Sequence, residues 1–323
     1  MKNIYLNIYK PNNLNLRKAK QIINNNNLIA IPTETVYGLA GNAYSNKAIK
    51  KIFYLKKRPY FNPLIVHFSN LKALRKDVII NDMFIKLYKA FCPGPITFIL
   101  NKNPKSKISS LVSANKNTVA VRIPKHHVAS NLLKLLKVPL AAPSANISTK
   151  LSPTSALDVV DEFRNKVKFI LDGGRCEIGL ESTIIDLTGK PTILRHGSIS
   201  PKKIGEVLRK KILTNKKSKK IKSPGQLKSH YSPGIPVFMN KKRSKAKANE
   251  AFITFGKKIK NAKNTFNLSN DGNLNKVANK LYTTMRKIKQ KGFKSISVCK
   301  IPNHGIGIAI NERLKKAAYK WKK

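Results

Sequence analysis

Residues 117–146 read NTVAVRIPKHHVASNLLKLLKVPLAAPSAN. The stretch TVAVRIP ends at a proline and has the β-branched residues and the short length of a strand. The apolar positions of 127–137 recur at helical spacing, and VPLAAP is a second short strand closed by a proline. A strand, a helix and a strand in this order predict an α/β protein.

The same alternation extends over the first 212 residues. Helices are predicted at 14–26, 46–57 and 154–164. Short strands bounded by Pro, Gly or Asn are predicted at LIAIP, PLIVHF, ITFIL, KFILDGG, STIIDL and TILRHG. We therefore expect residues 1–212 to form one α/β domain on a large mixed sheet.

The next segment, 213–234, differs in composition. It is basic, is interrupted by Pro and Gly, and contains few apolar residues to bury, as in a linker. Residues 235–323 again show strand patterns (AFITF, NTFNL and SISVCKI), with helices at 273–291 and 306–319. These patterns predict a second, smaller α/β domain.

The chain is strongly basic, because 65 Lys and Arg residues against 14 Asp and Glu give its 323 residues a formal net charge of +51. Such a charge attracts polyanions such as nucleic acids. Lys and Asn also crowd together in INNNNL and KKSKKIK, as expected when an A+T-rich genome biases surface codons. Charge alone leaves two explanations open, a nucleic-acid surface and compositional drift on solvated faces.

The three cysteines, Cys92, Cys176 and Cys299, lie far apart and form no C-x-x-C pair. A disulfide framework or a zinc site is therefore not expected, and a reducing compartment fits. The first residues lack the apolar stretch of a secretory signal, and no run approaches the roughly 18 apolar residues of a membrane span. We expect a cytoplasmic protein with no membrane segment.

Side chains alternate between the two faces of a strand, so the residues of 117–124 fall into two sets, one on each face. Val119, Val121 and Ile123 share one face, which we expect to enter the core. Thr118 and Arg122 share the other face. Arg122 is either a residue of a binding site or an ordinary solvated charge at a sheet edge.

Three loops that follow strands combine small and polar residues. PLAAPSANISTKLSPTS (139–155) places Ser144 and Asn146 two positions apart, so they point the same way if the chain is extended. IPTETVYGLAGNA (31–43) and DGGRCEIGLESTIIDL (172–187) offer further hydroxyls beside glycines. Loops at strand ends are where an α/β sheet usually binds its ligand, although surface turns share this composition.

Several motifs are missing. The sequence contains no P-loop, no G-x-S-x-G, no H-E-x-x-H and no obvious carboxylate pair for acid–base work. The available groups are cations, hydroxyls and amides, including Lys56, Arg58 and His67 in KKRPYFNPLIVH. This set suits the binding of phosphates and a carboxylate.

The segments PTETVYGL, KKRP…NPLIVH, PGPIT, VAVRIP, PLAAPSANIS, LDGG…GLESTIID and ILRHGSIS, in this order, resemble the YrdC-like family of L-threonylcarbamoyladenylate synthases. SPGQLKSHYSP and GIGIAINERLKKAA resemble its two-domain form. The resemblance implies a YrdC-like mixed, twisted sheet with helices in 1–212. It also implies a lid over the nucleotide in 213–234 and a Rossmann-like α/β domain in 235–323.

The resemblance implies a nucleotidyltransferase that forms L-threonylcarbamoyladenylate and pyrophosphate from L-threonine, bicarbonate or CO₂, and ATP with Mg²⁺. The expected partners are a transferase complex that passes the threonylcarbamoyl group to the adenosine beside a tRNA anticodon, and tRNA itself. The family's K-x-R…S-x-N signature falls on the expected catalytic residues, Lys56, Arg58, Ser144 and Asn146.

Two sets of ligand-binding residues carry over in the same way. The ATP site is expected to contain Arg58, Asn62, Thr118, Ser144, Ser152, Arg195 and Tyr231. The threonine site is expected to contain Thr35, His67, Arg122, Ala142 and Ser182. No side chain is assigned to a metal ion.

The chain departs from the family pattern at Cys92, Thr149, His196 and Gln226, where an aromatic residue, Gly, Pro and Met are usual. These departures bear on turnover, since none removes a proposed ligand. Two alternative functions share this fold: a double-stranded RNA- or tRNA-binding module without synthase activity, and the hydrogenase-maturation carbamoyltransferase. The second carries paired zinc-binding cysteines, which are missing here.

Overall fold

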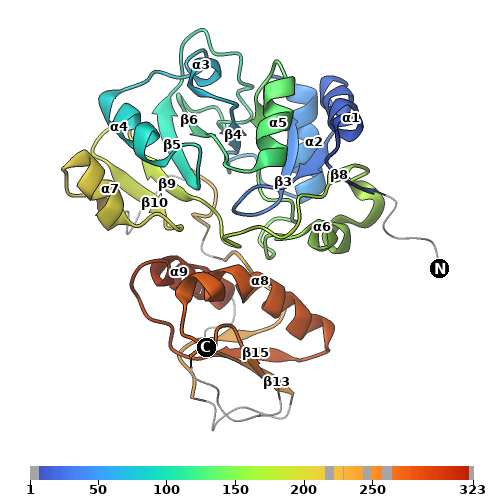
Figure 1. Cartoon of the computed structure of the whole chain (residues 1–323), viewed down its shortest axis with the longest axis vertical. Coiled ribbons are helices and arrows are strands. Elements are labelled where there is room, and N and C mark those ends of the chain that lie inside the picture. The colour runs from blue at the N-terminus through green and yellow to red at the C-terminus, as the bar shows by residue number, and fades with distance from the viewer. Residues whose placement is uncertain (1–6, 215–221, 228, 243–248, 257–263, 320–323) are drawn as a thin grey trace.

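The structure is a computed structural model that describes residues 7–214, 222–227, 229–242, 249–256 and 264–319. Its strands form two sheets, one in each of two α/β domains joined by a connecting segment (Figure 1). The predicted fold class is confirmed.

The first sheet has 11 strands and is mixed, as expected from the sequence. Its order is β1-β8-β2-β3-β7-β4-β6-β5-β9-β10-β11. The pair β4 and β6 is parallel, whereas β6 and β5 are antiparallel. The strands are β1 (Ile8–Tyr9), β2 (Ile29–Ile31), β3 (Gly38–Asn42), β4 (Ile65–His67), β5 (Ile96–Asn101), β6 (Thr118–Arg122), β7 (Leu140–Ala141), β8 (Ile170–Leu171), β9 (Thr183–Asp186), β10 (Thr192–Arg195) and β11 (Leu213–Thr214).

Helices cover the two faces of this sheet unequally. One face packs on α2 (Asn46–Lys56), α4 (Asp82–Phe91), α6 (Ala156–Phe163) and α7 (Pro201–Leu208), and their apolar residues form the main core with alternate strand residues. The other face packs on α1 (Asn13–Asn24) and α5 (His127–Leu135), but only over part of the sheet. The short elements α3 (Leu71–Leu74) and η1 (Arg164–Lys166) lie in connections.

The strand β6 obeys the predicted alternation. Val119 and Val121 enter the main core, and Ile123 follows them just after the strand. Ala120 lies on the opposite face, in a small cluster with Ile65 of β4, Ile99 and Ile184. On this face the central strands present polar residues to a pocket where α1 and α5 do not cover them.

The second sheet has four strands in the order β12-β15-β13-β14, all parallel. Its strands are β12 (Val237–Phe238), β13 (Glu250–Thr254), β14 (Thr265–Asn267) and β15 (Ser295–Val298). Its helices, α8 (Leu274–Gln290) and α9 (Gly307–Ala317), lie on the side of this sheet that faces the first domain (Figure 1). Six apolar residues of α8 are buried, at the spacing of an amphipathic helix.

The connecting segment is more buried than its composition predicts. Ser223, Pro224, Gly225, His230 and Tyr231 are all buried. The expectation that this segment has little to bury is therefore wrong for its described residues. The buried surface comes from packing between the two domains, which composition does not report.

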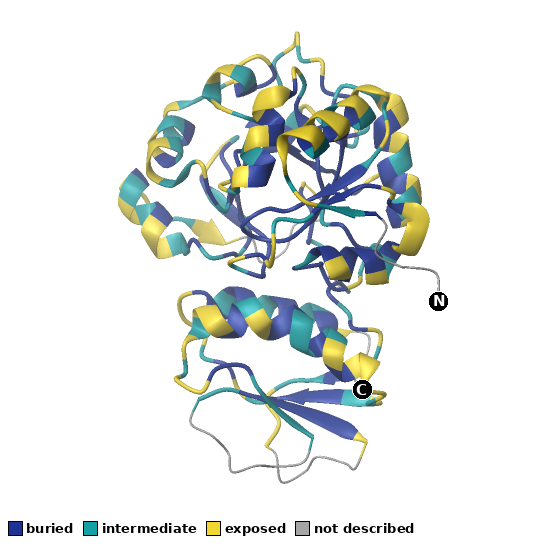
Figure 2. Ribbon diagram, turned by 45° about the vertical axis from the view of Figure 1, so that its right-hand side comes forward, coloured by how far each residue is buried: buried dark blue, intermediate teal, exposed yellow. Residues whose placement is uncertain are grey.

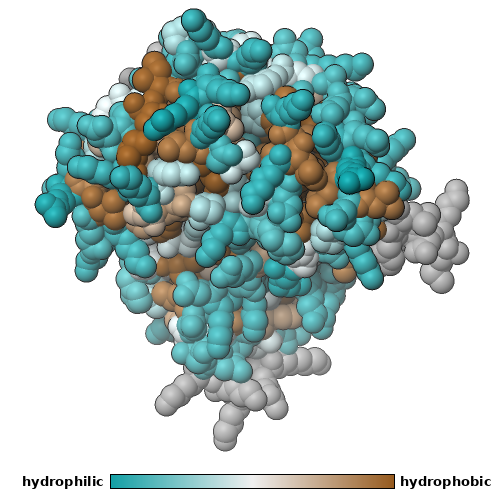
Figure 3. Space-filling model, turned by 45° about the horizontal axis from the view of Figure 1, so that its top comes forward, coloured by the Kyte–Doolittle hydropathy of each residue, from teal (hydrophilic) through white to brown (hydrophobic). Residues whose placement is uncertain are grey.

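Buried residues line the sheets and the inner helix faces, and exposed residues lie on the outer helix faces (Figure 2). Figure 3 shows hydrophilic side chains over most of one face of the molecule, with smaller hydrophobic patches between them. In the parts of the chain that the structure describes, none of the helices combines the length and apolar character that a bilayer crossing requires.

Candidate active site

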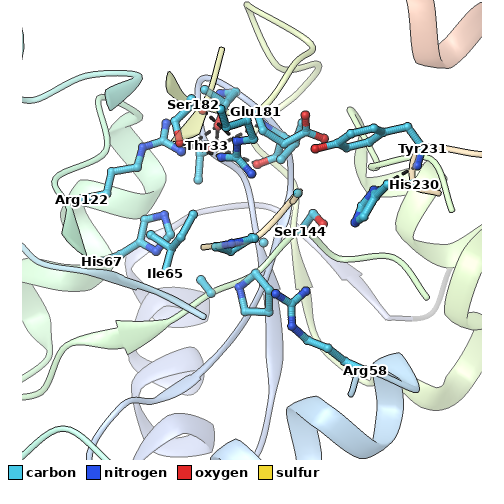
Figure 4. Close-up of a pocket in the computed structure, with 18 residues that line it drawn as sticks. Thr33, Arg58, Ile65, His67, Arg122, Ser144, Glu181, Ser182, His230 and Tyr231 are labelled. Atoms are coloured by element: carbon cyan, nitrogen blue, oxygen red, sulfur yellow. Dashed lines mark hydrogen bonds between the residues drawn. The ribbon is translucent and has the colours of Figure 1, made fainter. Parts of the chain in front are cut away.

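The pocket lies at the uncovered part of the first sheet and is closed by the connecting segment. Figure 4 shows Arg122 and His67 at one end, Tyr231 and His230 at the other, and Arg58 approaching from the end of α2. Its lining comprises Thr33, Thr35, Val36, Gly38, Arg58, Ile65, His67, Arg122, Ala142, Pro143, Ser144, Glu181, Ser182, Arg195, Pro224, Gly225, His230 and Tyr231.

Arg122 is buried at the centre of the sheet, because β6 lies between β4 and β5. Its Nε donates to the carbonyl of Gly94, and one terminal nitrogen donates to Thr35 Oγ1 at 2.8 Å. The other terminal nitrogen lies 2.9 Å from Glu34 Oε1. The interpretation of Arg122 as a solvated edge charge is therefore wrong, and its fork is held in a fixed orientation.

His67 stands beside Arg122, since the two residues are paired across β4 and β6. Burial, followed by the positive charge of Arg122, lowers the pKa of His67 to about 3. The imidazole is therefore neutral near pH 7, and it can donate or accept a hydrogen bond without adding a charge.

The end of α2 turns Arg58 into the pocket. Lys57 adopts a left-handed conformation with φ 49°, and the Arg58 amide donates back to the Phe53 carbonyl, which closes the helix. Pro59 prevents continuation of the helix. Arg58 then donates to the Asn62 side chain and to the carbonyls of Asn62 and Pro63, so Asn62 fixes the guanidinium rather than lining the pocket.

Lys56 lies two residues before Arg58 and points behind the pocket wall. Its ammonium group donates to the backbone carbonyls of Ser144 and Asn146. The Asn146 amide in turn donates to the carbonyls of Ile147 and Lys150. Lys56 and Asn146 therefore hold the loop that presents Ser144, which does line the pocket.

Positive charge is concentrated around this pocket. Burial, and then the nearby Arg195, lower the pKa of Arg58 to about 9. Burial, and then Arg58, lower the pKa of Lys56 well below its ordinary value. Buried cations that repel one another favour the binding of an anion, because a bound anion restores the charged forms.

Arg195 and Glu181 form the wall beneath the connecting segment. Arg195 donates from Nε to the Ser182 carbonyl and from a terminal nitrogen to Ser182 Oγ, both at 3.0 Å. Glu181 accepts from Ser152 Oγ at 2.5 Å. Burial alone raises the pKa of Glu181, but Arg313 and Arg195 outweigh it, together with the Ser152 hydroxyl, and bring that pKa to about 2.

The connecting segment closes the pocket. Tyr231 is 1% exposed, and its hydroxyl lies against Gly225, whose φ of +85° and lack of a side chain permit this approach. The free space in the pocket is about 40 Å³, room for a few water molecules at most. This free space is smaller than a nucleotide.

The predicted residues fall into two groups. All five of the predicted threonine ligands line the pocket, namely Thr35, His67, Arg122, Ala142 and Ser182. So do Arg58, Ser144, Arg195 and Tyr231. Asn62, Ser152, Lys56 and Asn146 are buried behind the lining. Thr118 is partly exposed at the far end of β6 from Arg122, outside the lining.

Glu34 and Glu181 were not assigned from the sequence, although Glu34 contacts Arg122 and Glu181 lines the pocket. Two features of the sequence could have pointed to Glu181. Acidic residues are rare, since only 14 occur in the chain, and Glu181 directly precedes Ser182, a predicted ligand. Its partner Arg313 is 132 residues away in sequence, and no local pattern connects them.

The departures from the family pattern have local consequences. Thr149, where Gly is usual, has φ +72°, a conformation that is strained for a β-branched residue. The His196 amide, which Pro would lack, donates to Glu312 of α9 at 3.1 Å. Gln226 accepts from the amides of Lys222 and Ser223 and closes a turn in the connecting segment.

The fold and the pocket define a two-domain α/β protein with a strongly cationic site for anionic ligands. The protein-family model described as "Telomere recombination" matches residues 21–197, and the family model described as "Threonylcarbamoyl-AMP synthase, C-terminal domain" matches residues 199–319. The chain belongs to the threonylcarbamoyl-AMP synthase family, which confirms the resemblance seen in its motifs.

Named relatives span nearly the whole chain. The threonylcarbamoyl-AMP synthase of Pyrococcus abyssi is 37% identical, with 94% of each chain covered. That of Bacillus subtilis is 34% identical, covering 95% of this chain and 94% of the relative. The crystal structure of P. abyssi Sua5 complexed with L-threonine superposes with a TM-score of 0.88 at 33% identity, covering 97% of each chain.

Proposed function

We propose that this pocket joins L-threonine, bicarbonate or CO₂, and ATP into threonylcarbamoyl-AMP and pyrophosphate. The observation that carries the assignment is the pair Arg58 and Arg195. Both are buried in the pocket, and neither makes an ion pair with any of the residues that the structure describes. Buried charges are normally paired, so two such guanidinium groups favour an anionic ligand such as a polyphosphate.

The substrates are assigned to the two ends of the pocket. Arg122 presents a planar fork suited to both oxygens of the threonine carboxylate, which would compete with Glu34 for it. His67, Thr35, Ala142 and Ser182 surround that end. Arg58 and Ser144 lie toward the connecting segment (Figure 4), and Arg195 lies against Gly225 of that segment. These three residues suit the phosphates of ATP.

The reaction requires two bond-forming steps. The threonine amine adds to CO₂ with loss of a proton, or to bicarbonate with loss of water, and gives a carbamate. A carbamate oxygen then attacks the α-phosphorus, and the bond to pyrophosphate breaks. Arg58 and Arg195 stabilise the charge that grows on the leaving phosphates, because they are fixed by Asn62 and Ser182 before the reaction begins.

Side-chain proton transfer plays a small part in this scheme. His67 is neutral and close to the proposed threonine carboxylate, and Glu181 is ionised and engaged by Ser152 and Arg313. Catalysis then rests on orientation of the carbamate and on fixed positive charge. The absence of a carboxylate pair in the sequence agrees with this mechanism.

Mg²⁺ is proposed as the companion of ATP rather than as a resident ion. Among the described residues, His, Cys, Asp and Glu side chains never gather in threes around a point where a metal ion could bind. Two carboxylates at the pocket, Glu34 and Glu181, are both engaged by arginines. When bound, Mg²⁺ supplies charge neutralisation on the phosphate oxygens, with oxygen ligands from phosphate and water.

The connecting segment is proposed to act as a lid. Its Tyr231 and His230 are buried and line the pocket, so they must leave when ATP enters and return when the segment closes over the nucleotide. Closure excludes water, which protects an easily hydrolysed carbamoyl adenylate.

The product is proposed to pass to a transferase complex that modifies the tRNA adenosine beside the anticodon, with contact between this basic chain and tRNA. A cytoplasmic location is also proposed. It is supported by the three cysteines, which are free thiols, as is usual in a reducing compartment.

The test is incubation with ATP, Mg²⁺, bicarbonate and threonine, followed by detection of pyrophosphate and threonylcarbamoyl-AMP. We expect both products in equal amounts, and neither when threonine or bicarbonate is omitted. The rival function, an RNA-binding module without synthase activity, predicts RNA binding and no adduct. That result would exclude the proposal.

A further inference from the structure

The helix α9 of the C-terminal domain reaches the catalytic pocket through Arg313. This side chain is 1% exposed, and its Nε donates to Glu181 Oε2 at 2.8 Å. Tyr282 of α8 also donates to the Glu181 carboxylate, at 3.2 Å. Glu181 is therefore held by two residues of the other domain, although it belongs to the pocket lining.

Arg313 also supports the tyrosine of the lid. Its guanidinium carbon lies 5.0 Å from the centre of the Tyr231 ring, within the range of a cation–π contact. The rings of Tyr231 and Tyr282 are also stacked, with their centres 6.0 Å apart. Among the described residues, neither terminal nitrogen of Arg313 finds a hydrogen-bond acceptor, and one of them lies 3.6 Å from Glu312 Oε2. Nε therefore binds Glu181 while the guanidinium carbon lies over the ring.

A neighbouring lysine of α9 extends the same contact. Lys316 donates from its ammonium group to the Gly225 carbonyl, and its own carbonyl accepts from the His230 amide. One turn of α9 thus binds the lid at Gly225, His230 and Tyr231. Residues 311–317 read NERLKKA, a segment to which the proposed reaction assigns no role.

The charge of Arg313 affects ATP binding because it holds the carboxylate of Glu181, which lies close to Arg195. Glu181 and Arg195 are close enough to influence each other's ionisation. If Glu181 were free, its carboxylate would pair with Arg195 or repel the phosphates. Arg313 takes up this carboxylate, and among the described residues the Arg195 side chain is left hydrogen-bonded to Ser182 alone.

We propose that Arg313 is a positioning residue of the active site. It keeps Glu181 away from Arg195, and Tyr231 packs against it when the lid closes. The inference rests on the proposed function, since it assumes that ATP binds at Arg58 and Arg195. It assigns the C-terminal domain a part in nucleotide binding that the pocket lining alone does not reveal.

The test compares the full-length protein with Arg313→Ala, Glu181→Gln and the double variant. The readouts are the KM for ATP, kcat, and hydrogen-exchange protection of the amides of residues 230–232. Arg313→Ala should raise the KM for ATP about tenfold or more and lower the protection of these amides. Adding Glu181→Gln should restore much of the ATP affinity, because the freed negative charge is removed, but it should not restore the protection.

Arg286→Ala is the matched control. Arg286 also crosses the domain interface, to the Leu151 carbonyl and toward Asp158 and Glu162, but among the described residues no hydrogen bond or ion pair joins it to Glu181 or to Tyr231. It should leave the KM for ATP and the protection unchanged. If Arg313→Ala does not fold, Arg313→Lys serves in its place, since lysine keeps the charge and loses the planar contact with Tyr231; it should keep the KM for ATP and lower the protection.

Three results would overturn the inference while the wild-type protein is active. They are wild-type behaviour of Arg313→Ala, an equal loss in Arg286→Ala, and no recovery of ATP affinity in the double variant. If the wild-type protein itself makes no threonylcarbamoyl-AMP, the proposed function has failed instead, so the two failures are distinguishable.

Discussion

Acidification should open the lid through His230. In the closed segment, burial lowers the pKa of His230 from 6.5 to about 3. Among the charges around it, Glu181 favours the protonated form, whereas Arg58, Lys316 and Lys56 oppose it. Its Nδ1 also accepts from the Tyr231 amide at 2.9 Å, a bond that protonation would break.

The direction and size of this pH effect follow from the difference between the pKa of His230 in the closed lid and its pKa in the open lid. The closed lid binds fewer protons than the open lid, in which His230 is solvated, so closure is fully favoured above pH 6.5 and weakens as the pH falls toward 3. With these two pKa values, the closing equilibrium at about pH 5.5 is about tenfold weaker than at about pH 7.5, or about 1.4 kcal/mol.

Hydrogen exchange measures this equilibrium directly. The amides of residues 230 and 232 donate to the carbonyls of Lys316 and Thr149 when the lid is closed. Their protection factors, corrected for intrinsic exchange, should fall about tenfold between these two pH values. The amides of β5 serve as a reference for opening of the core.

His230→Gln is the matched variant, because glutamine can accept the same bond and does not titrate. Its protection should be nearly independent of pH over this range. A fall of the same size in His230→Gln, or no fall in the wild-type protein, would refute the assignment of the switch to His230.

Three further predictions concern single residues. Arg58→Ala should keep the fold and lower the rate of synthesis about a hundredfold, about 3 kcal/mol for one lost charge-assisted contact; an active, folded variant removes Arg58 from the site. Arg122→Lys should raise the KM for threonine more than that for ATP, because lysine keeps the charge and loses the fork that also contacts Thr35 and Gly94; equal effects on both KM values contradict the assignment. Thr149→Gly should stabilise the protein by about 1 kcal/mol, because it relieves the positive φ of Thr149, and a lower urea midpoint would show that the strain is not there.

Much of the fold could be predicted because it depends on local patterns. The helices at α2, α5 and α8 begin within one residue of their predicted starts. The alternation in β6 placed Val121 and Arg122 on opposite faces, as observed. The order of strands could not be predicted, since it depends on pairings between distant segments, and that order is what buries Arg122.

In the candidate site too, residues in motifs could be predicted, whereas contacts between distant segments could not. Motifs brought together Arg58, Ser144 and Arg122, which do line one pocket. The sequence could not show that Lys56 holds the backbone of the Ser144 loop from behind, because this depends on a contact over 88 residues. Nor could composition show that a basic, Pro- and Gly-rich segment is buried, since the surface that buries it belongs to α8 and α9.

The most direct test of the site is a crystal structure of this protein with L-threonine and a non-hydrolysable ATP analogue. We expect the threonine carboxylate on Arg122, the phosphates between Arg58 and Arg195, and Tyr231 docked against Arg313 over the nucleotide. Threonine bound away from Arg122, or phosphates that contact neither Arg58 nor Arg195, would contradict the placement of the reaction in this pocket.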